Sequence, residues 1–266
     1  MRIQTMLAAF ALCATQSFAI FGIGGHYSPS VTTKLNASKQ QTVKSIEVEN
    51  ATVGQVLYAH KSFSSMQGFG FKAWIDILPI IDIEATYNIQ WGSYDASLFI
   101  QAGNEDPIEQ PLEVEFGGVP FGKATPKYVG MNGDLSVTYP ITFLPIVRPY
   151  VGAGITYFLN TPLMDSSFIA KFMNSADNVA GNILLDQNSQ MDASKGAELA
   201  KALAKEVAEE ELQKSIGAHI LLGVRIDPPI IPIAFYVNGK YYIGGDFHDD
   251  IEMGRFVFEV GAGFAL

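Results

Sequence analysis

Cysteine is nearly absent from the sequence, and its absence removes one common source of stability. The chain has 266 residues and a single cysteine, Cys13, which lies within an apolar N-terminal segment. One cysteine cannot form an intramolecular disulfide, so the chain must be stable through its fold alone.

Positive charge is also scarce. Lys and Arg number 17 against 27 Asp and Glu, which gives a formal net charge of -10 at pH 7. Because nucleic acids are polyanions that bind basic surfaces, nucleic acid is not an expected partner.

Long hydrophobic runs are the third absence. The chain is 48% hydrophobic and its mean hydropathy is +0.18. Beyond the N-terminal segment, however, no window approaches the roughly 18 continuous apolar residues that a membrane-spanning helix needs. Any crossing of a membrane must therefore use another kind of element.

The N-terminal segment has the organisation of a secretory signal. Arg2 precedes an apolar run over 6–14, and Ser17, Phe18 and Ala19 form a small-x-small cleavage site. We expect residues 1–19 to be a cleaved signal peptide, with a buried first helix as the alternative. Cys13 follows Leu12 instead of a small residue, so we do not expect a lipid anchor there.

Alternation of apolar and polar residues runs through much of the remaining chain. In 81–91, Ile81 and Ile83 share one parity while Asp82 and Glu84 occupy the other. Residues of one parity face one side of a strand, and roughly 9–11 residues let a tilted strand cross a bilayer. The eight alternating segments are 20–27, 67–77, 81–91, 129–139, 147–157, 216–227, 231–243 and 256–266.

Charged residues keep to one parity in every segment, which is typical of a barrel with an apolar exterior and a polar interior. We therefore predict an all-β fold, a transmembrane antiparallel up-and-down β-barrel of eight strands, formed by residues 20–266 as one domain. A secreted soluble β-domain is the rival interpretation, since soluble sandwiches also alternate.

Connections between these segments alternate in length. Three are short and turn on Pro-Ile sequences, as in "DILPIIDIE" at 76–84, whereas the longer ones cover 28–66, 92–127, 160–214 and 244–252. Tight periplasmic turns and longer extracellular loops are typical of outer-membrane barrels. Proline at a turn fixes φ and has no N–H to donate, which stops the ladder from extending.

The long connections contain further elements. Residues 42–50 with 53–60, and 95–103 with 110–118, have the pattern of two hairpins. We expect them to prolong strands above the membrane; if they entered it, the barrel would have 10 or 12 strands. An amphipathic helix is predicted over 192–214, within a helical insertion of about 163–214. We expect it to cap the barrel mouth, with a plug, a receptor surface or a lid as alternatives.

The C-terminal segment "FVFEVGAGFAL" resembles the assembly signal of small outer-membrane barrels of the OmpA and OmpX type and of uncharacterised outer-membrane barrel families. Its alternating apolar residues are Phe256, Phe258, Val260, Phe264 and Leu266, with Leu266 where phenylalanine is usual. The resemblance implies a bacterial outer-membrane location, contact with outer-membrane lipid and lipopolysaccharide, and assembly by periplasmic chaperones and the barrel-assembly machinery. It also implies that an extracellular ligand would bind through the loops.

Parity places a set of charged and polar side chains inside the predicted barrel. An eight-stranded barrel has an interior only wide enough for its own side chains, so we expect a polar core that neutralises itself. A narrow selective pore is the alternative. The predicted set is Lys72, Asp76, Asp82, Glu84, Asp134, Arg148, His219, Arg225, Asp227, Lys240, Arg255 and Glu259.

No spacing among the four histidines and the serines recommends a catalytic set. We predict no catalytic residue, no cofactor and no metal site. The expected function is a non-enzymatic structural or surface-interaction role, with a small pore or transporter as the alternative and an outer-membrane lipid-modifying enzyme as the third hypothesis.

Overall fold

The computed structural model describes eleven segments of the chain. The predicted signal peptide (1–19), Arg255 and Leu266 lie outside them. The described residues are 21–76, 80–113, 127–141, 146–161, 163–175, 179–186, 188–209, 212–228, 231–245, 251–252 and 256–265.

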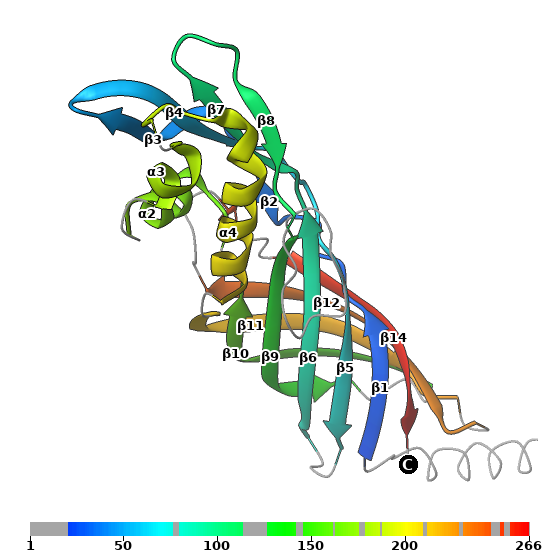
Figure 1. Cartoon of the computed structure of the whole chain (residues 1–266). Helices are drawn as coiled ribbons and strands as arrows, with labels where there is room; N and C mark the ends of the chain where they lie inside the picture. Colours follow the sequence, from blue (N-terminus) through cyan, green and yellow to red (C-terminus); the bar gives the residue numbers. More distant parts are fainter. Residues whose placement is uncertain are drawn as a thin grey trace, which may run out of the picture.

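Eight antiparallel strands close into a barrel (Figure 1). Each strand pairs with its neighbour along the chain, and β1 pairs with β14 to close the ring, with Gly22 opposite Ala265 and Tyr27 opposite Val260. The predicted fold class and strand count are confirmed. The barrel strands are β1 (Phe21–Tyr27), β5 (Gln67–Ile75), β6 (Asp82–Ser93), β9 (Lys127–Pro140), β10 (Val147–Asn160), β11 (Gln213–Ile226), β12 (Ile233–Gly244) and β14 (Phe256–Ala265).

Burial in the barrel is inverted relative to a soluble protein. Aliphatic side chains face outward, with Ile216 75% and Leu222 64% exposed, while Lys240 and Glu259 are 0% exposed inside. Lysine and glutamate are almost never fully buried unless paired, and large exposed apolar surfaces mark a non-aqueous contact. The outer face is therefore built for lipid.

No helix in the described part of the chain is long and apolar enough to span a membrane.

The short connections all lie at one end of the barrel because consecutive strands of an up-and-down barrel alternate in direction. One backbone bond at this end joins two neighbouring turns, since Asp227 N–H donates to the Ile146 carbonyl at 3.0 Å. Another lies within the turn between β9 and β10, where Ile141 N–H donates to the Pro149 carbonyl at 2.7 Å. Parts of all three corners (77–79, 142–145 and 229–230) lie outside the described residues.

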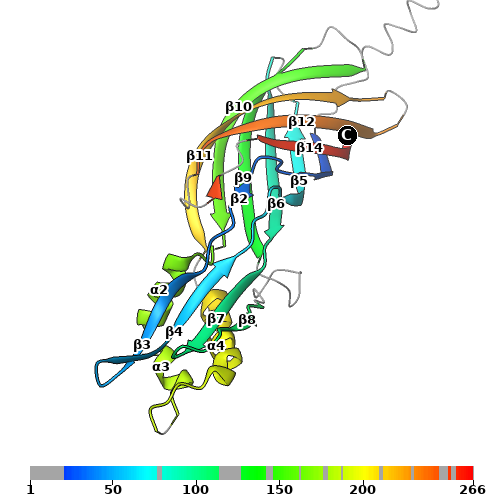
Figure 2. The same cartoon turned by 90° about the horizontal axis from the view of Figure 1, so that it is seen from above.

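The long connections meet at the other end and build a second layer (Figures 1 and 2). Its four-stranded sheet has the order β3-β4-β7-β8 and stays outside the barrel. The first predicted hairpin pairs as β3 with β4. In the second, β7 pairs with residues 108–111, earlier than the predicted 110–118, of which 114–118 lie outside the described residues. The elements are β3 (Gln41–Val48), β4 (Ala51–His60), β7 (Ala96–Ala102), β8 (Ile108–Pro111), α2 (Ser166–Ser175), α3 (Val179–Leu184), η1 (Ala193–Lys195) and α4 (Gly196–Glu209). A short pair, β2 (Lys34–Leu35) with β13 (Ile251–Glu252), lies beside the barrel rim.

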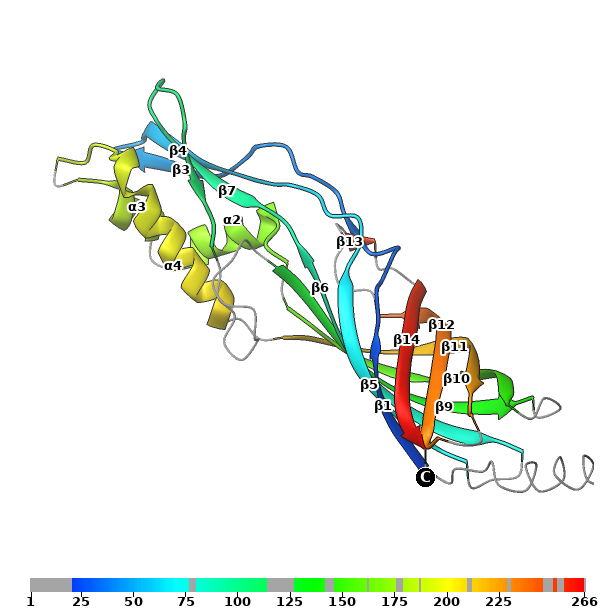
Figure 3. The same ribbon diagram turned by 90° about the vertical axis from the view of Figure 1, so that its right-hand side faces the viewer.

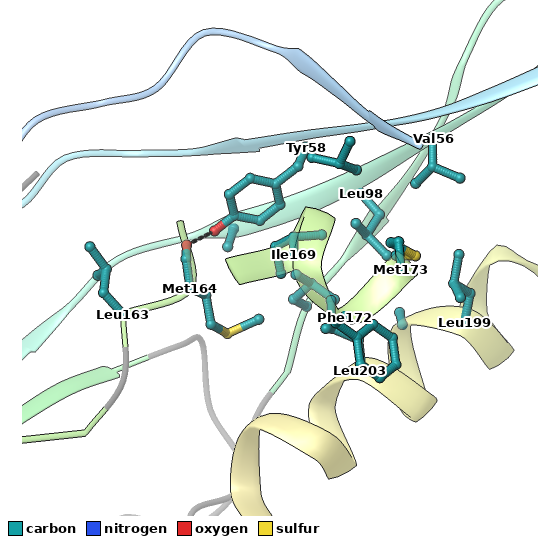
Figure 4. Close-up of a cluster of buried hydrophobic side chains, with 14 of the residues drawn as sticks. Val56, Tyr58, Leu98, Leu163, Met164, Ile169, Phe172, Met173, Leu199 and Leu203 are labelled. Carbon is teal, nitrogen blue, oxygen red and sulfur yellow. Dashed lines mark hydrogen bonds between the residues drawn. The ribbon is translucent and has the colours of Figure 1, made fainter. Parts of the chain in front are cut away.

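The helices cover one face of this sheet, a packing partner that the prediction of a cap on the barrel mouth did not include. Ile169 of α2 and Leu203 of α4 are fully buried together with Val56 of β4 and Leu98 of β7 (Figure 4). The alternating strands β4 and β7 present one apolar face, and the amphipathic helices bury it. We call the sheet and its helices the outer layer.

Candidate functional site

Two arginines and three aspartates meet at the end of the lumen nearest the short connections. Arg225 donates to both carboxylate oxygens of Asp76, at 2.5 and 3.3 Å, and to Asp227 at 3.2 Å. Arg225 also lies 3.7 Å from Asp82. Arg148 lies 3.7 Å from Asp76 and 3.5 Å from Asp227. Because β5 and β11 stand opposite each other in the ring, the bond from Arg225 to Asp76 crosses the lumen.

Lys72 occupies the next level. Its Nζ lies 2.8 Å from Glu84 and donates to the Tyr150 hydroxyl at 2.9 Å. The ammonium also lies 5.0 Å from the ring centre of Tyr150 and 4.8 Å from that of Tyr236, within cation–π range. The Tyr150 hydroxyl in turn donates to Asn238. Two aromatic rings and one carboxylate thus hold a fully buried cation.

Lys240 bridges two carboxylates from other strands. Its Nζ lies 2.7 Å from Asp134 on β9 and 2.7 Å from Glu259 on β14. Glu259 also accepts from Asn88 at 3.1 Å and from Asn238 at 2.8 Å. Asp134, Lys240 and Glu259 side chains are all 0% exposed, so each charge depends on these partners.

The two lumen histidines are held by neutral groups. His26 contacts Asn88 at 2.6 Å and the Tyr236 hydroxyl at 3.1 Å, and lies 3.8 Å from Glu259. His219 bonds through one ring nitrogen to Ser136 and through the other to Thr156, each at 2.8 Å. A catalytic serine–histidine pair needs a carboxylate at the second nitrogen and access for a substrate, whereas His219 has a threonine there and is 1% exposed.

Glycines on one wall make room for this network. A Cβ placed at Gly22 of β1 would lie 2.1 Å from the Trp74 ring, and one at Gly70 of β5 would lie 2.3 Å from the side-chain oxygen of Asn88. Large side chains and glycines therefore interdigitate across the lumen, as close packing requires.

Of the predicted lumen set, every member except Arg255 lies in the described part of the chain, and these members all face the interior. The six carboxylates face four cations there. Some of the ion pairs join neighbouring strands, as Lys72 and Glu84 do, and others join strands distant in sequence, as Arg225 and Asp76 do. The prediction omitted uncharged members that share the same parity and that parity alone could have found. These are His26, Trp74, Asn88, Tyr150, Tyr236, Asn238 and Tyr242.

Four of the five residues predicted to form the assembly signal face outward on β14, and the fifth, Leu266, lies outside the described residues. Phe256, Phe258, Val260 and Phe264 are 43–61% exposed. Their role in assembly stays a prediction.

The outer layer is joined to the barrel connections through the backbone of Met164. Tyr58 of β4 donates to the Met164 carbonyl, and the Met164 N–H donates to the Tyr94 hydroxyl at 3.2 Å (Figure 4 shows the first bond). Burial raises the pKa of Tyr58 and of Tyr94 well above the usual value for tyrosine, so both phenols stay protonated. The segment that leads into α2 is thereby fixed to the sheet.

Among the described residues, no group of three or more His, Cys, Asp and Glu side chains is arranged to hold a metal ion.

Closure of eight strands, an apolar exterior and a charged, self-bonded interior define a small transmembrane β-barrel of the outer-membrane type.

No protein-family model matches the sequence, and no curated protein matches it. Among solved structures, the chain is similar to the outer membrane protein OprG from Pseudomonas aeruginosa, with 12% identity, a TM-score of 0.42 and coverage of 92% of this chain and 94% of that one. It is also similar to the N-terminal barrel domain of Pseudomonas aeruginosa OprF (11%, TM-score 0.36, 92% and 96% covered). A third match is Ail, the attachment invasion locus protein of Yersinia pestis (9%, TM-score 0.39, 92% and 96% covered). The fold assignment rests on strand order and register, not on these distant likenesses.

Proposed function

We propose that this chain is a non-enzymatic protein of the bacterial outer membrane with a structural or surface-interaction role, in which a sealed barrel anchors the outer layer at the cell surface. The observation that carries the proposal is the lumen, which is crossed at successive levels by buried ion pairs.

Two of the lumen ion pairs join opposite or nearly opposite sides of the barrel. Asp76, the residue after β5, meets Arg225 on β11, and Asp134 on β9 meets Lys240 on β12. An ion path would require these pairs to separate within a low-dielectric interior. Removing one partner of a buried pair typically costs about 3–5 kcal/mol, so opening several levels at once is unfavourable.

The placement of the outer layer supports the surface role. The described parts of the long connections lie at the end opposite the short turns (Figure 3). They bury a hydrophobic core of their own. In barrels with periplasmic short turns, that end faces the exterior. A folded layer in this position has the surface that recognition of another molecule requires.

The proposal is tested by single-channel recording. The full chain is refolded in detergent and inserted into planar lipid bilayers, with a porin in the same bilayers as the positive control. We expect no discrete conductance steps from this chain. Reproducible steps from protein shown to be folded would contradict the sealed barrel and favour a small pore.

A further inference from the structure

A pocket of about 420 Å³ lies on the face of the outer-layer sheet that the helices leave uncovered. Figure 3 shows the helices along the opposite face. The pocket sits where β4 ends and β7 begins, so it adjoins the barrel rim. We call it the base pocket. Its volume is within the range of small-molecule sites, roughly 300–1,000 Å³.

Backbone hydrogen bonds hold the segments that form the base pocket in place. Its floor is formed by β4 and β7, where Ala59 and Phe99 share the uncovered face. On one side, Ser38 N–H donates to the His60 carbonyl at 3.0 Å, and His60 N–H donates to the Ser38 hydroxyl at 2.8 Å. On the other side, Leu112 N–H donates to Ala96 at 2.9 Å. Both walls are thus fixed to the floor, as in a preformed site.

The lining of the base pocket combines apolar and acidic side chains. Phe99 and Pro111 give the pocket an apolar surface, and carboxylates of Asp95, Glu109 and Glu113 surround it. The cation of the lining is Lys61, which lies 2.9 Å from Asp95.

The lining carries a net negative charge, because it has three carboxylates and one lysine. Asp95 is matched by Lys61, and its hydrogen bond raises the pKa of Lys61 above the usual lysine value. Glu109 accepts a hydrogen bond from the neutral hydroxyl of Ser97 at 2.7 Å, and Glu113 lies exposed at the rim. With one cation against three carboxylates, the lining attracts positive charge.

We propose that the base pocket binds a small organic amine, with its ammonium group between Glu109 and Glu113 and its apolar body on Phe99 and Pro111. An ammonium satisfies carboxylates by charge-assisted hydrogen bonds, and the apolar body removes the floor from water. The inference deepens the proposed function, which places this pocket at the outer surface.

The test uses the full chain in lipid nanodiscs with 4-phenylbutylamine as the probe. Saturation-transfer NMR measures binding of the probe, and empty nanodiscs are the control. The neutral 4-phenylbutanol and the anionic 4-phenylbutyrate have the same apolar body. We expect saturable binding of the amine that weakens as salt increases, weaker binding of the alcohol and no binding of the carboxylate.

Two matched double variants locate the site. Glu109→Gln with Glu113→Gln removes two charges from the lining, and we expect amine affinity to fall about 10-fold. Glu105→Gln with Asp106→Asn removes two exposed charges from the adjacent turn, outside the lining, and should leave affinity unchanged. Equal affinity in the two variants, or amine signals no greater than in empty nanodiscs, would overturn the proposal.

Conductance recorded on the same preparation separates the two ideas. A barrel that conducts ions and binds the amine refutes the proposed sealed anchor and supports the proposed amine site. A barrel that shows no conductance and does not bind the amine supports the proposed sealed anchor and refutes the proposed amine site.

Discussion

Lys240 lies on β12 with its side chain fully buried, 2.7 Å from carboxylates on β9 and on β14. The free-energy cost of burying these three charges is offset only while all three are present. The surrounding amides reinforce the arrangement, because Asn88 and Asn238 both donate to Glu259.

Replacing this lysine tests the dependence directly. Lys240→Met leaves Asp134 and Glu259 without their shared cation, and we expect the barrel to lose about 3–5 kcal/mol of stability. The urea midpoint for loss of the folded band on a gel measures the change. Lys201→Met, at an exposed position of α4, is the control and should unfold like the parent.

Adding Asp134→Asn and Glu259→Gln to Lys240→Met removes the two carboxylate charges that the first substitution leaves unpaired. This triple variant should recover part of the lost stability. Equal midpoints for Lys240→Met and Lys201→Met would show that the lumen pairs do not stabilise the barrel.

The hydrogen bond from Tyr58 to the Met164 carbonyl leads to a second prediction for a single residue. Tyr58→Phe leaves the buried Met164 carbonyl without the donor it has in the parent, a change that typically costs about 1–3 kcal/mol. We expect faster hydrogen exchange in α2 and little change in the barrel strands. Tyr27→Phe, on the exposed outer face of β1, should leave both unchanged. Unaltered exchange in α2 after Tyr58→Phe would argue against this bond.

At the scale of one element, α2 depends on the cap at its N-terminus. Asp165 accepts from the Phe168 N–H at 2.6 Å and from the Ser167 hydroxyl at 2.8 Å, while its carbonyl accepts from the Ile169 N–H at 3.1 Å. This is an N-cap, which satisfies donors that the first turn cannot satisfy itself.

Asp165→Ala should therefore lower the stability of the outer layer by about 1 kcal/mol. Asp165→Asn preserves a capping oxygen and should lie close to the parent. Protease susceptibility of the 163–175 segment ranks the three proteins. If the alanine and asparagine variants are cleaved equally fast, the cap is not what holds the helix.

Elements differ in how far the sequence predicts them. The barrel strands were predictable because alternation is local and each strand carries its own pattern, as in β6. Pairing of β4 with β7 was not, because their register joins residues such as His60 and Ala96 from different connections. The amphipathic pattern of α4 identified its apolar face, but the sheet that covers that face could be known only from the fold.

At the scale of the whole molecule, parity predicted which charged residues face inward but not which of them pair. Asp76 and Arg225 are 149 residues apart and meet only because closure sets β5 and β11 across the ring. Parity also places uncharged side chains such as Tyr150 and Asn238 inside, but the hydrogen bond between these two could be known only from the fold. The outer layer likewise required three separate connections to assemble at one end.

Gel migration of the full chain refolded in detergent tests most directly whether the strands form a closed, lipid-embedded barrel. Closed barrels of this type resist unfolding without heat, so the unboiled protein should migrate faster than the boiled protein. Identical migration, together with solubility after detergent removal, would contradict the membrane barrel.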